Sequence, residues 1–185
     1  MPSSATNGDS YFLASGSQMT AGSKTIAGST SSYSESVPSG STTLSYTQTT
    51  GFNTATINFT SSGFSYSIPW VRSVSDGCTW NLAYSITWTP PGGSATTVAS
   101  STLSSISTSG TISSSVTPSL SSAIGTATVK ITLTFTNTRL GTAHTYTGSA
   151  TQTVGGVYTR YLRSGGAWTK QWLIYIIKFY YIIIP

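Results

Sequence analysis

Strict alternation of apolar and hydroxyl-bearing side chains between Thr126 and Thr138 constrains the fold more than any other feature of this sequence. In the stretch TATVKITLTFTNT, every second residue from Val129 to Phe135 is apolar, while Thr and one Lys fill the intervening positions. A period of two places alternate side chains on opposite faces of a β-strand. The stretch therefore predicts a strand with one buried face and one hydroxyl-rich face.

The same alternation recurs along the chain, with turn signals roughly every eight to twelve residues. Further strands are expected at 42–48, 54–60, 64–74, 78–89, 95–103, 111–117 and 143–153. Asp76-Gly77 favours a tight turn, which predicts that strands 64–74 and 78–89 form a hairpin. No sustained helical period appears. We expect an all-β fold, an antiparallel β-sandwich of immunoglobulin-like or jelly-roll-like type.

Hydroxyl groups replace charge on the expected surface. Charged residues are 6% of the 185 residues, against roughly 25% in ordinary soluble domains, whereas Ser and Thr make up about two in five residues. The net charge is +5, and half of the basic residues follow Tyr158. Nucleic-acid binding is not predicted, because no nucleic-acid motif or basic face accompanies the excess.

Three regions of different composition divide the chain. Residues 1–40 are Ser- and Gly-rich and poor in apolar residues, which predicts a flexible or extended arm that docks on a neighbouring subunit. Residues 41–155 form the predicted sandwich core, and residues 156–185 a C-terminal hairpin with an apolar assembly segment. The first ten residues have no basic start or apolar run, so no secretory leader is expected there.

Groups that could carry out catalysis are few. The carboxylates are Asp9, Glu35 and Asp76, the sole histidine is His144 and the sole cysteine is Cys78. His144 has no acid nearby in sequence, although it could pair in space with Cys78 or a serine. We predict no catalytic, cofactor-binding or metal-binding residues, and a protein that is not an enzyme.

Two tryptophans share one face of the expected strand 78–89. Trp80 and Trp88 alternate with polar residues, which is typical of a buried sheet face. The alternative is a ligand platform, because a ring face complements the C–H face of a sugar. The core interpretation is favoured, and solvent exposure of these rings distinguishes the two.

The segment VYTRYLRSGGAWTK, residues 157–170, predicts a further hairpin around its Gly-Gly pair. This segment resembles a short aromatic, Arg, Gly-Gly and Trp element near the ends of structural proteins of tailed bacteriophages. The matching positions are Tyr158, Arg160, Gly165, Gly166, Trp168 and Lys170. The resemblance implies a virion component such as a tail, fibre or head-decoration protein.

The last fourteen residues, WLIYIIKFYYIIIP, are apolar on both faces if they form a strand. A helix of this length would span about 21 Å, short of a hydrocarbon core of about 30 Å. We therefore predict an assembly element buried between protomers or against another coat protein, with lipid contact through residues 172–185 as the alternative. The predicted assembly residues are Trp172, Leu173, Ile174, Ile176, Ile177, Phe179, Tyr180, Ile182 and Ile183.

These observations favour a virion structural protein that acts by self-association and by contacts with other virion proteins. One alternative is an extracellular or cell-surface filament or adhesin subunit that exchanges strands between subunits. For that class, Asn58-Phe59-Thr60 is a glycosylation sequence. The other alternative is a carbohydrate-binding module, which requires Trp80 or Trp88 to be exposed.

Overall fold

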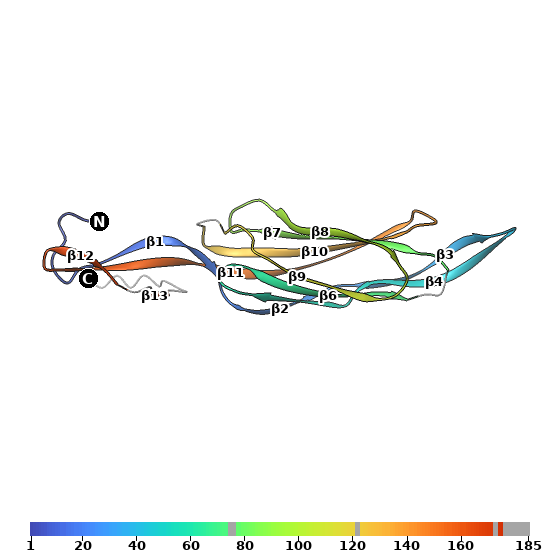
Figure 1. The fold of residues 1–185 in the computed structure, drawn as a ribbon, viewed down its shortest axis with the longest axis horizontal. Helices are drawn as coiled ribbons and strands as arrows, with labels where there is room; N and C mark the ends of the chain where they lie inside the picture. The colour runs from blue at the N-terminus through green and yellow to red at the C-terminus, as the bar shows by residue number, and fades with distance from the viewer. Residues whose placement is uncertain (74–76, 121–122, 172–173, 176–185) are drawn as a thin grey trace.

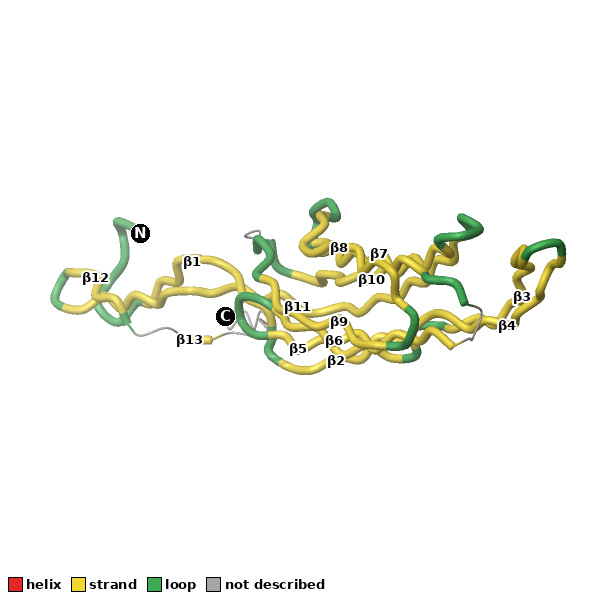
Figure 2. The backbone as a smooth tube through the Cα atoms, turned by 45° about the vertical axis from the view of Figure 1, so that its right-hand side comes forward, coloured by secondary structure: helices red, strands yellow, loops and turns green. Residues whose placement is uncertain are grey.

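The computed structural model describes residues 1–73, 77–120, 123–171 and 174–175. These residues form an elongated all-β molecule in which two antiparallel sheets face each other and a projection of paired strands leaves each end (Figure 1). Most strands run along the long axis, as a second view shows (Figure 2). The predicted all-β, sandwich-like class is therefore confirmed. Among the described residues, no helix is long and apolar enough to cross a membrane.

Sheet A has the strand order β1-β11-β10-β7-β8, and β12 and β13 pair with β11. β11 is long enough to pair with β10 in its first half and with β1 in its second. The strands of sheet A are β1 (Ser10–Met19), β7 (Trp80–Thr89), β8 (Thr96–Ile106), β10 (Gly125–Asn137), β11 (Ala143–Ser164), β12 (Ala167–Lys170) and β13 (Ile174–Tyr175).

Sheet B has the strand order β2-β5-β6-β4-β3, and β9 pairs with β6. One edge of β6 pairs with β5 and β4 along its two halves, and its other edge pairs with β9. The strands of sheet B are β2 (Gly22–Ala27), β3 (Thr30–Ser39), β4 (Thr42–Phe52), β5 (Thr54–Phe59), β6 (Phe64–Ser73) and β9 (Gly110–Val116).

The core lies between the two sheets and follows the alternation of the sequence. All four alternate apolar residues of β10, from Val129 to Phe135, are fully buried. Rings from opposite sheets meet across this layer: the Phe64 and Trp88 centroids are 6.1 Å apart, as are those of Trp70 and Phe135. Aromatic pairs at this separation add to the stabilisation from burial.

The predicted hairpin between residues 64–74 and 78–89 is wrong. β6 belongs to sheet B and β7 to sheet A, so these consecutive strands do not pair with each other. Each strand carries a complete apolar face, and packing the two faces against each other buries both. The Asp-Gly signal does not determine which sheet the next strand joins.

The flexible or extended arm predicted at residues 1–40 is instead part of the two sheets, because β1, β2 and β3 pair within this chain. Each contributes a buried apolar side chain to the core: Met19, Ile26 and Val37. A strand at a sheet edge needs few apolar residues, since backbone hydrogen bonds to its neighbour satisfy its polar groups. Low apolar content therefore indicated edge strands rather than a separate arm.

The predicted boundary at residues 155 and 156 falls inside β11, which runs from Ala143 to Ser164 without interruption. The predicted Gly-Gly hairpin is confirmed: Ser164 pairs with Ala167, and Gly165 and Gly166 have φ values of 58° and 78°. Positive φ at both central positions is the requirement of a type I′ turn, which glycine meets without strain.

Candidate functional site

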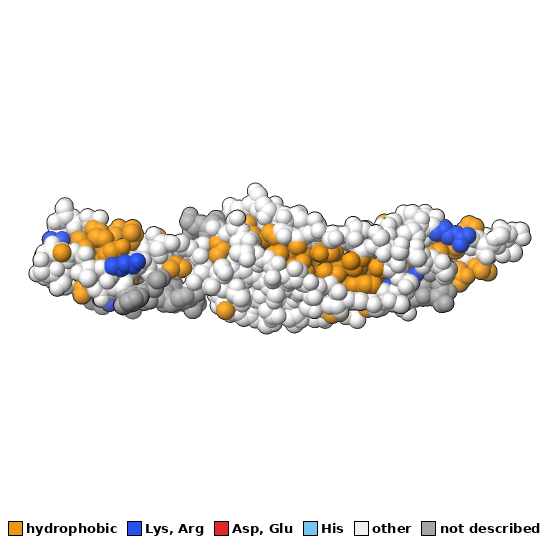
Figure 3. Space-filling model, in the orientation of Figure 1, with side chains coloured by type: hydrophobic (Ala, Val, Ile, Leu, Met, Phe, Trp, Pro, Cys, Tyr) orange, Lys and Arg blue, Asp and Glu red, His pale blue; other side chains and the backbone are white. Residues whose placement is uncertain are grey.

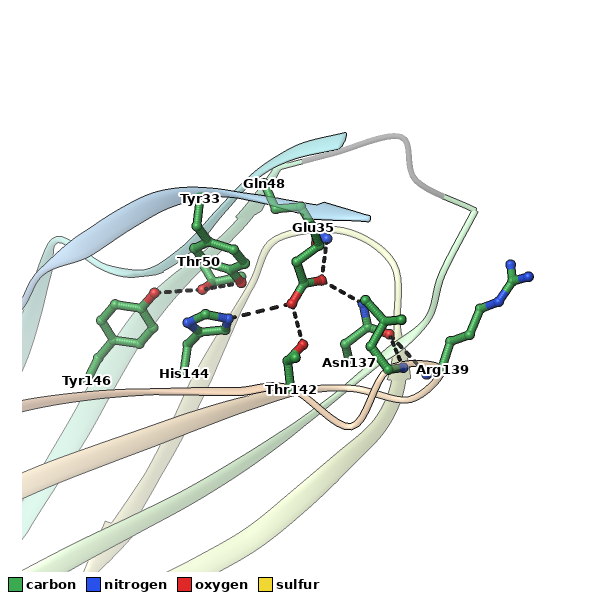
Figure 4. A network of polar contacts seen from close by, with 10 residues as sticks. Tyr33, Glu35, Gln48, Thr50, Asn137, Arg139, Thr142, His144 and Tyr146 are labelled. Carbon is green, nitrogen blue, oxygen red and sulfur yellow. Dashed lines mark hydrogen bonds and ion pairs between the residues drawn. The ribbon is translucent and has the colours of Figure 1, made fainter. Parts of the chain in front are cut away.

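A buried carboxylate joins the two sheets at one end of the sandwich (Figure 4). Glu35 lies on β3 of sheet B, and its partners come from β4 of the same sheet and from β10, β11 and their connecting loop in sheet A. We call this group the Glu35 cluster. It comprises Tyr33, Glu35, Gln48, Thr50, Asn137, Thr142, His144 and Tyr146.

Uncharged donors from both sheets surround the carboxylate of Glu35, which is only 7% exposed. Its Oε2 accepts hydrogen bonds from Gln48 Nε2 at 2.6 Å and from Asn137 Nδ2 at 2.8 Å. Its Oε1 accepts from the Thr142 hydroxyl, and His144 Nε2 lies 3.7 Å from the same oxygen. Hydrogen bonds of this kind compensate a carboxylate for lost water.

Aromatic and hydroxyl groups extend the cluster toward the core. The Tyr33 ring stacks on His144 with centroids 3.7 Å apart. The Tyr33 and Tyr146 hydroxyls both lie within hydrogen-bonding distance of Thr50 Oγ1, at 3.2 Å and 2.7 Å. Burial raises the pKa of Tyr33 to about 12, because desolvation penalises the phenolate.

The loop between β10 and β11 is held beside the cluster. Asn137 Oδ1 accepts hydrogen bonds from the backbone amides of Arg139 at 2.9 Å and Leu140 at 3.2 Å. The Arg139 guanidinium donates to the carbonyl of Pro38 on β3. These bonds and those of Glu35 connect the β3–β4 projection to sheet A. The cluster therefore serves as a non-covalent link between the two sheets.

Sequence reasoning missed the pairing of Glu35 with His144. It assigned Glu35 to an arm and found no acid near His144, although residues 35 and 144 are far apart only in sequence. A signal was present: Tyr33, Glu35 and Val37 alternate with serines. That pattern predicts an inward-facing carboxylate.

The two candidate platform tryptophans lie in the core. Trp80 is 0% exposed and Trp88 is 1% exposed. The sugar-platform interpretation is wrong for these rings, because stacking on a ligand requires an open ring face. Cys78 is also buried, and its carbonyl accepts a hydrogen bond from Arg72 at 2.9 Å. Within the described ranges, no group of three or more His, Cys, Asp or Glu side chains could hold a metal ion.

A second candidate site is the projection at the other end of the molecule, which we call the ribbon (Figure 1). It consists of residues 10–14 of β1, residues 157–164 of β11, and β12. Phe12 is 38% exposed and Leu13 is 45% exposed, on successive positions of β1. Successive residues of a strand point to opposite faces, so each face of the ribbon exposes one of these large hydrophobic side chains.

The predicted assembly residues lie largely outside the described part of the chain. Only the backbone of Ile174 is described, and it pairs with Tyr158 of the ribbon. The predicted residues that are not described are Trp172, Leu173, Ile176, Ile177, Phe179, Tyr180, Ile182 and Ile183.

No protein-family model, curated protein or solved structure matches this chain.

Proposed function

We propose that this chain is a virion structural protein, in a capsid-associated, decoration, spike, tail or fibre position, that acts by self-association and contacts with other virion proteins. The observation that carries the proposal is the ribbon, which stands away from the sandwich and exposes large hydrophobic side chains. The ribbon is three strands wide where β12 pairs with β11, yet Phe12 remains 38% exposed and Leu13 remains 45% exposed. Contact with a partner in an assembly would remove these side chains from water.

The apolar C-terminal segment extends this proposed contact region. The Gln171 amide donates to the Arg160 carbonyl at 2.8 Å, and Ile174 pairs with Tyr158. The segment therefore starts beside the ribbon, as the described positions Gln171 and Ile174 show. The hydroxyl-rich sheet faces and the resemblance of residues 157–170 to phage structural proteins also support this role.

Light scattering of the purified full chain tests self-association. We expect a mass several times the 19.3 kDa of one chain, and a monomer when Ile176, Ile177, Ile182 and Ile183 are all replaced by Ser. Leu44→Ser is the matched control, because Leu44 is 43% exposed on β4 at the opposite end. A monomeric full chain would contradict the proposal.

Mass spectrometry of purified virus particles tests the location. Peptides of this chain are expected at a fixed ratio to the major coat protein. The alternative of an extracellular filament or adhesin subunit is favoured by one feature, the exposed Asn58 on β5 within its glycosylation sequence. A glycan on Asn58 in the native protein, together with absence from particles, would favour that alternative.

A further inference from the structure

One face of the ribbon gathers aromatic, apolar and basic side chains. Residues directly opposite in an antiparallel pair share a face: Tyr161 lies opposite both Tyr11 and Lys170, and Arg163 lies opposite Trp168. Residues two apart on a strand also share a face. The resulting group, called here the aromatic-basic face, comprises Tyr11, Leu13, Tyr161, Arg163, Trp168 and Lys170.

Side-chain contacts agree with this register. The rings of Tyr11 and Trp168 meet edge to face with centroids 6.2 Å apart. The Arg163 guanidinium carbon lies 5.9 Å from the centroid of the Trp168 ring. A space-filling view shows hydrophobic side chains beside Lys and Arg side chains at this end of the molecule (Figure 3).

The opposite face of the ribbon has a similar character. Phe12, which is 38% exposed, lies opposite Arg160 on that face. Leu13, on the aromatic-basic face, is 45% exposed. A lipid headgroup layer that surrounds the ribbon would cover the exposed apolar side chains of both faces.

The charge at this end is positive. Arg160, Arg163 and Lys170 supply three positive charges, and the nearest carboxylate in the sequence, Asp9, supplies one negative charge, which leaves +2. The Asp9 side chain already accepts a hydrogen bond from the Thr6 amide at 2.7 Å. An anionic partner is therefore electrostatically favoured.

We propose that the ribbon inserts into the headgroup layer of an anionic lipid bilayer. Trp and Tyr concentrate at membrane interfaces because they are apolar with a polar tip, and exposed Leu and Phe gain by leaving water. Each Lys or Arg near an anionic surface adds about a fivefold gain in binding. The ribbon lies at the extreme end of the long axis, so the sandwich does not obstruct an end-on approach (Figure 1).

Vesicle sedimentation of the full chain tests this inference. The probes are vesicles of phosphatidylcholine alone and of phosphatidylcholine mixed with phosphatidylglycerol. We expect binding to the mixed vesicles, weaker binding to the zwitterionic ones, and weakening as salt is added. The measurement does not depend on self-association, so it can fail or succeed independently of the proposed virion role.

Paired substitutions identify the ribbon as the binding element. Leu13→Ser should weaken binding to mixed vesicles about tenfold, because the exposed side chain no longer leaves water on insertion. Lys170→Gln should weaken it about fivefold. The controls are Leu44→Ser, with a similarly exposed Leu at the far end, and Lys130→Gln, with an exposed Lys on β10. All four positions are exposed, and circular dichroism checks that each variant folds.

Three results would overturn the inference. One is the absence of binding to either vesicle. Another is equal weakening by ribbon and control substitutions, which would assign binding to a different part of the chain. The third is displacement of the chain from mixed vesicles by a single-stranded oligonucleotide whose binding Lys170→Gln weakens. That displacement would identify nucleic acid as the preferred partner of the ribbon.

Discussion

Glu35 shows how a single side chain can determine the arrangement of one end of the molecule. Its carboxylate receives hydrogen bonds from β4, β10 and the loop before β11, so it connects elements that the sequence places far apart. Amide and hydroxyl donors contact the carboxylate, and His144 Nε2 lies farther from it, at 3.7 Å. Such a carboxylate is stabilised only while its donors stay in place.

Glu35→Ala should lower the free energy of unfolding by about 3 kcal/mol, because the buried amides of Gln48 and Asn137 lose their acceptor. Urea unfolding followed by circular dichroism measures the change. Asp9→Asn is the control, since Asp9 is exposed and should change stability by less than about 0.5 kcal/mol. Equal effects of the two substitutions would contradict a cross-linking role for Glu35.

Tyr33 should make stability depend on pH in alkaline solution. Its pKa is about 12 in the folded protein and 10.0 in the unfolded chain. Below about pH 10 both states are protonated, and between about pH 10 and 12 the unfolded chain ionises first, so stability falls as pH rises. Burial also raises the pKa of Tyr66 above its ordinary value, as it does for Tyr33.

Tyr33→Phe should therefore lose less stability than the parent protein between about pH 10 and 12. Urea midpoints measured across that interval provide the test. The comparison concerns the slope with pH, because the substitution also removes the contact between the Tyr33 and Thr50 hydroxyls. Identical slopes for the two proteins would show that Tyr33 does not titrate differently on unfolding.

At the scale of elements, the sequence predicted strands well and their partners less well. The alternation in β10 and β7 determines which side chains are buried, because a period of two leaves no choice of face. The partner of each strand depends on contacts between residues far apart, such as Phe64 with Trp88. Likewise, the alternation around Glu35 predicts that its side chain faces inward. The alternation does not predict its contact with His144, which lies far away in the sequence.

Gly148 on β11 allows the two sheets to approach closely. A Cβ at this position would lie 2.5 Å from Ile26 Cγ2 and 2.8 Å from the Ala27 carbonyl oxygen on β2. Gly148→Ala should therefore cost about 2 kcal/mol in unfolding free energy, because β2 must move. Gly155→Ala on the same strand is the control, since a Cβ there meets nothing within 4 Å. A stable Gly148→Ala protein would imply that β2 shifts easily.

At the scale of the whole molecule, the sandwich and the ribbon differ in how they are stabilised. The sandwich encloses a continuous core between two sheets, while the ribbon has cross-strand pairs and exposed apolar side chains. Segments with few buried contacts open locally at a lower free energy than the core. The molecule should therefore combine a cooperative body with an end that opens independently.

Amide hydrogen exchange of the isolated chain should show this difference. Amides of residues 10–14 should exchange through local opening that depends little on denaturant, and those of residues 129–135 only through global unfolding. Binding of the ribbon to a partner or to vesicles should protect residues 10–14 and leave the core amides unchanged. Uniform protection along the isolated chain would contradict this division.

β11 connects the two ends of the molecule through one uninterrupted covalent path. It carries His144 near its start and Arg163 near its end, so 22 residues at about 3.3 Å each give a strut of about 70 Å. A force that pulls the ribbon along the axis of β11 would load the hydrogen bonds between β11 and β10 in shear. These bonds would then resist the force all at once, instead of breaking one after another. Mechanical tension applied to the ribbon would thus be shared by the strands of the sandwich and would reach the Glu35 cluster.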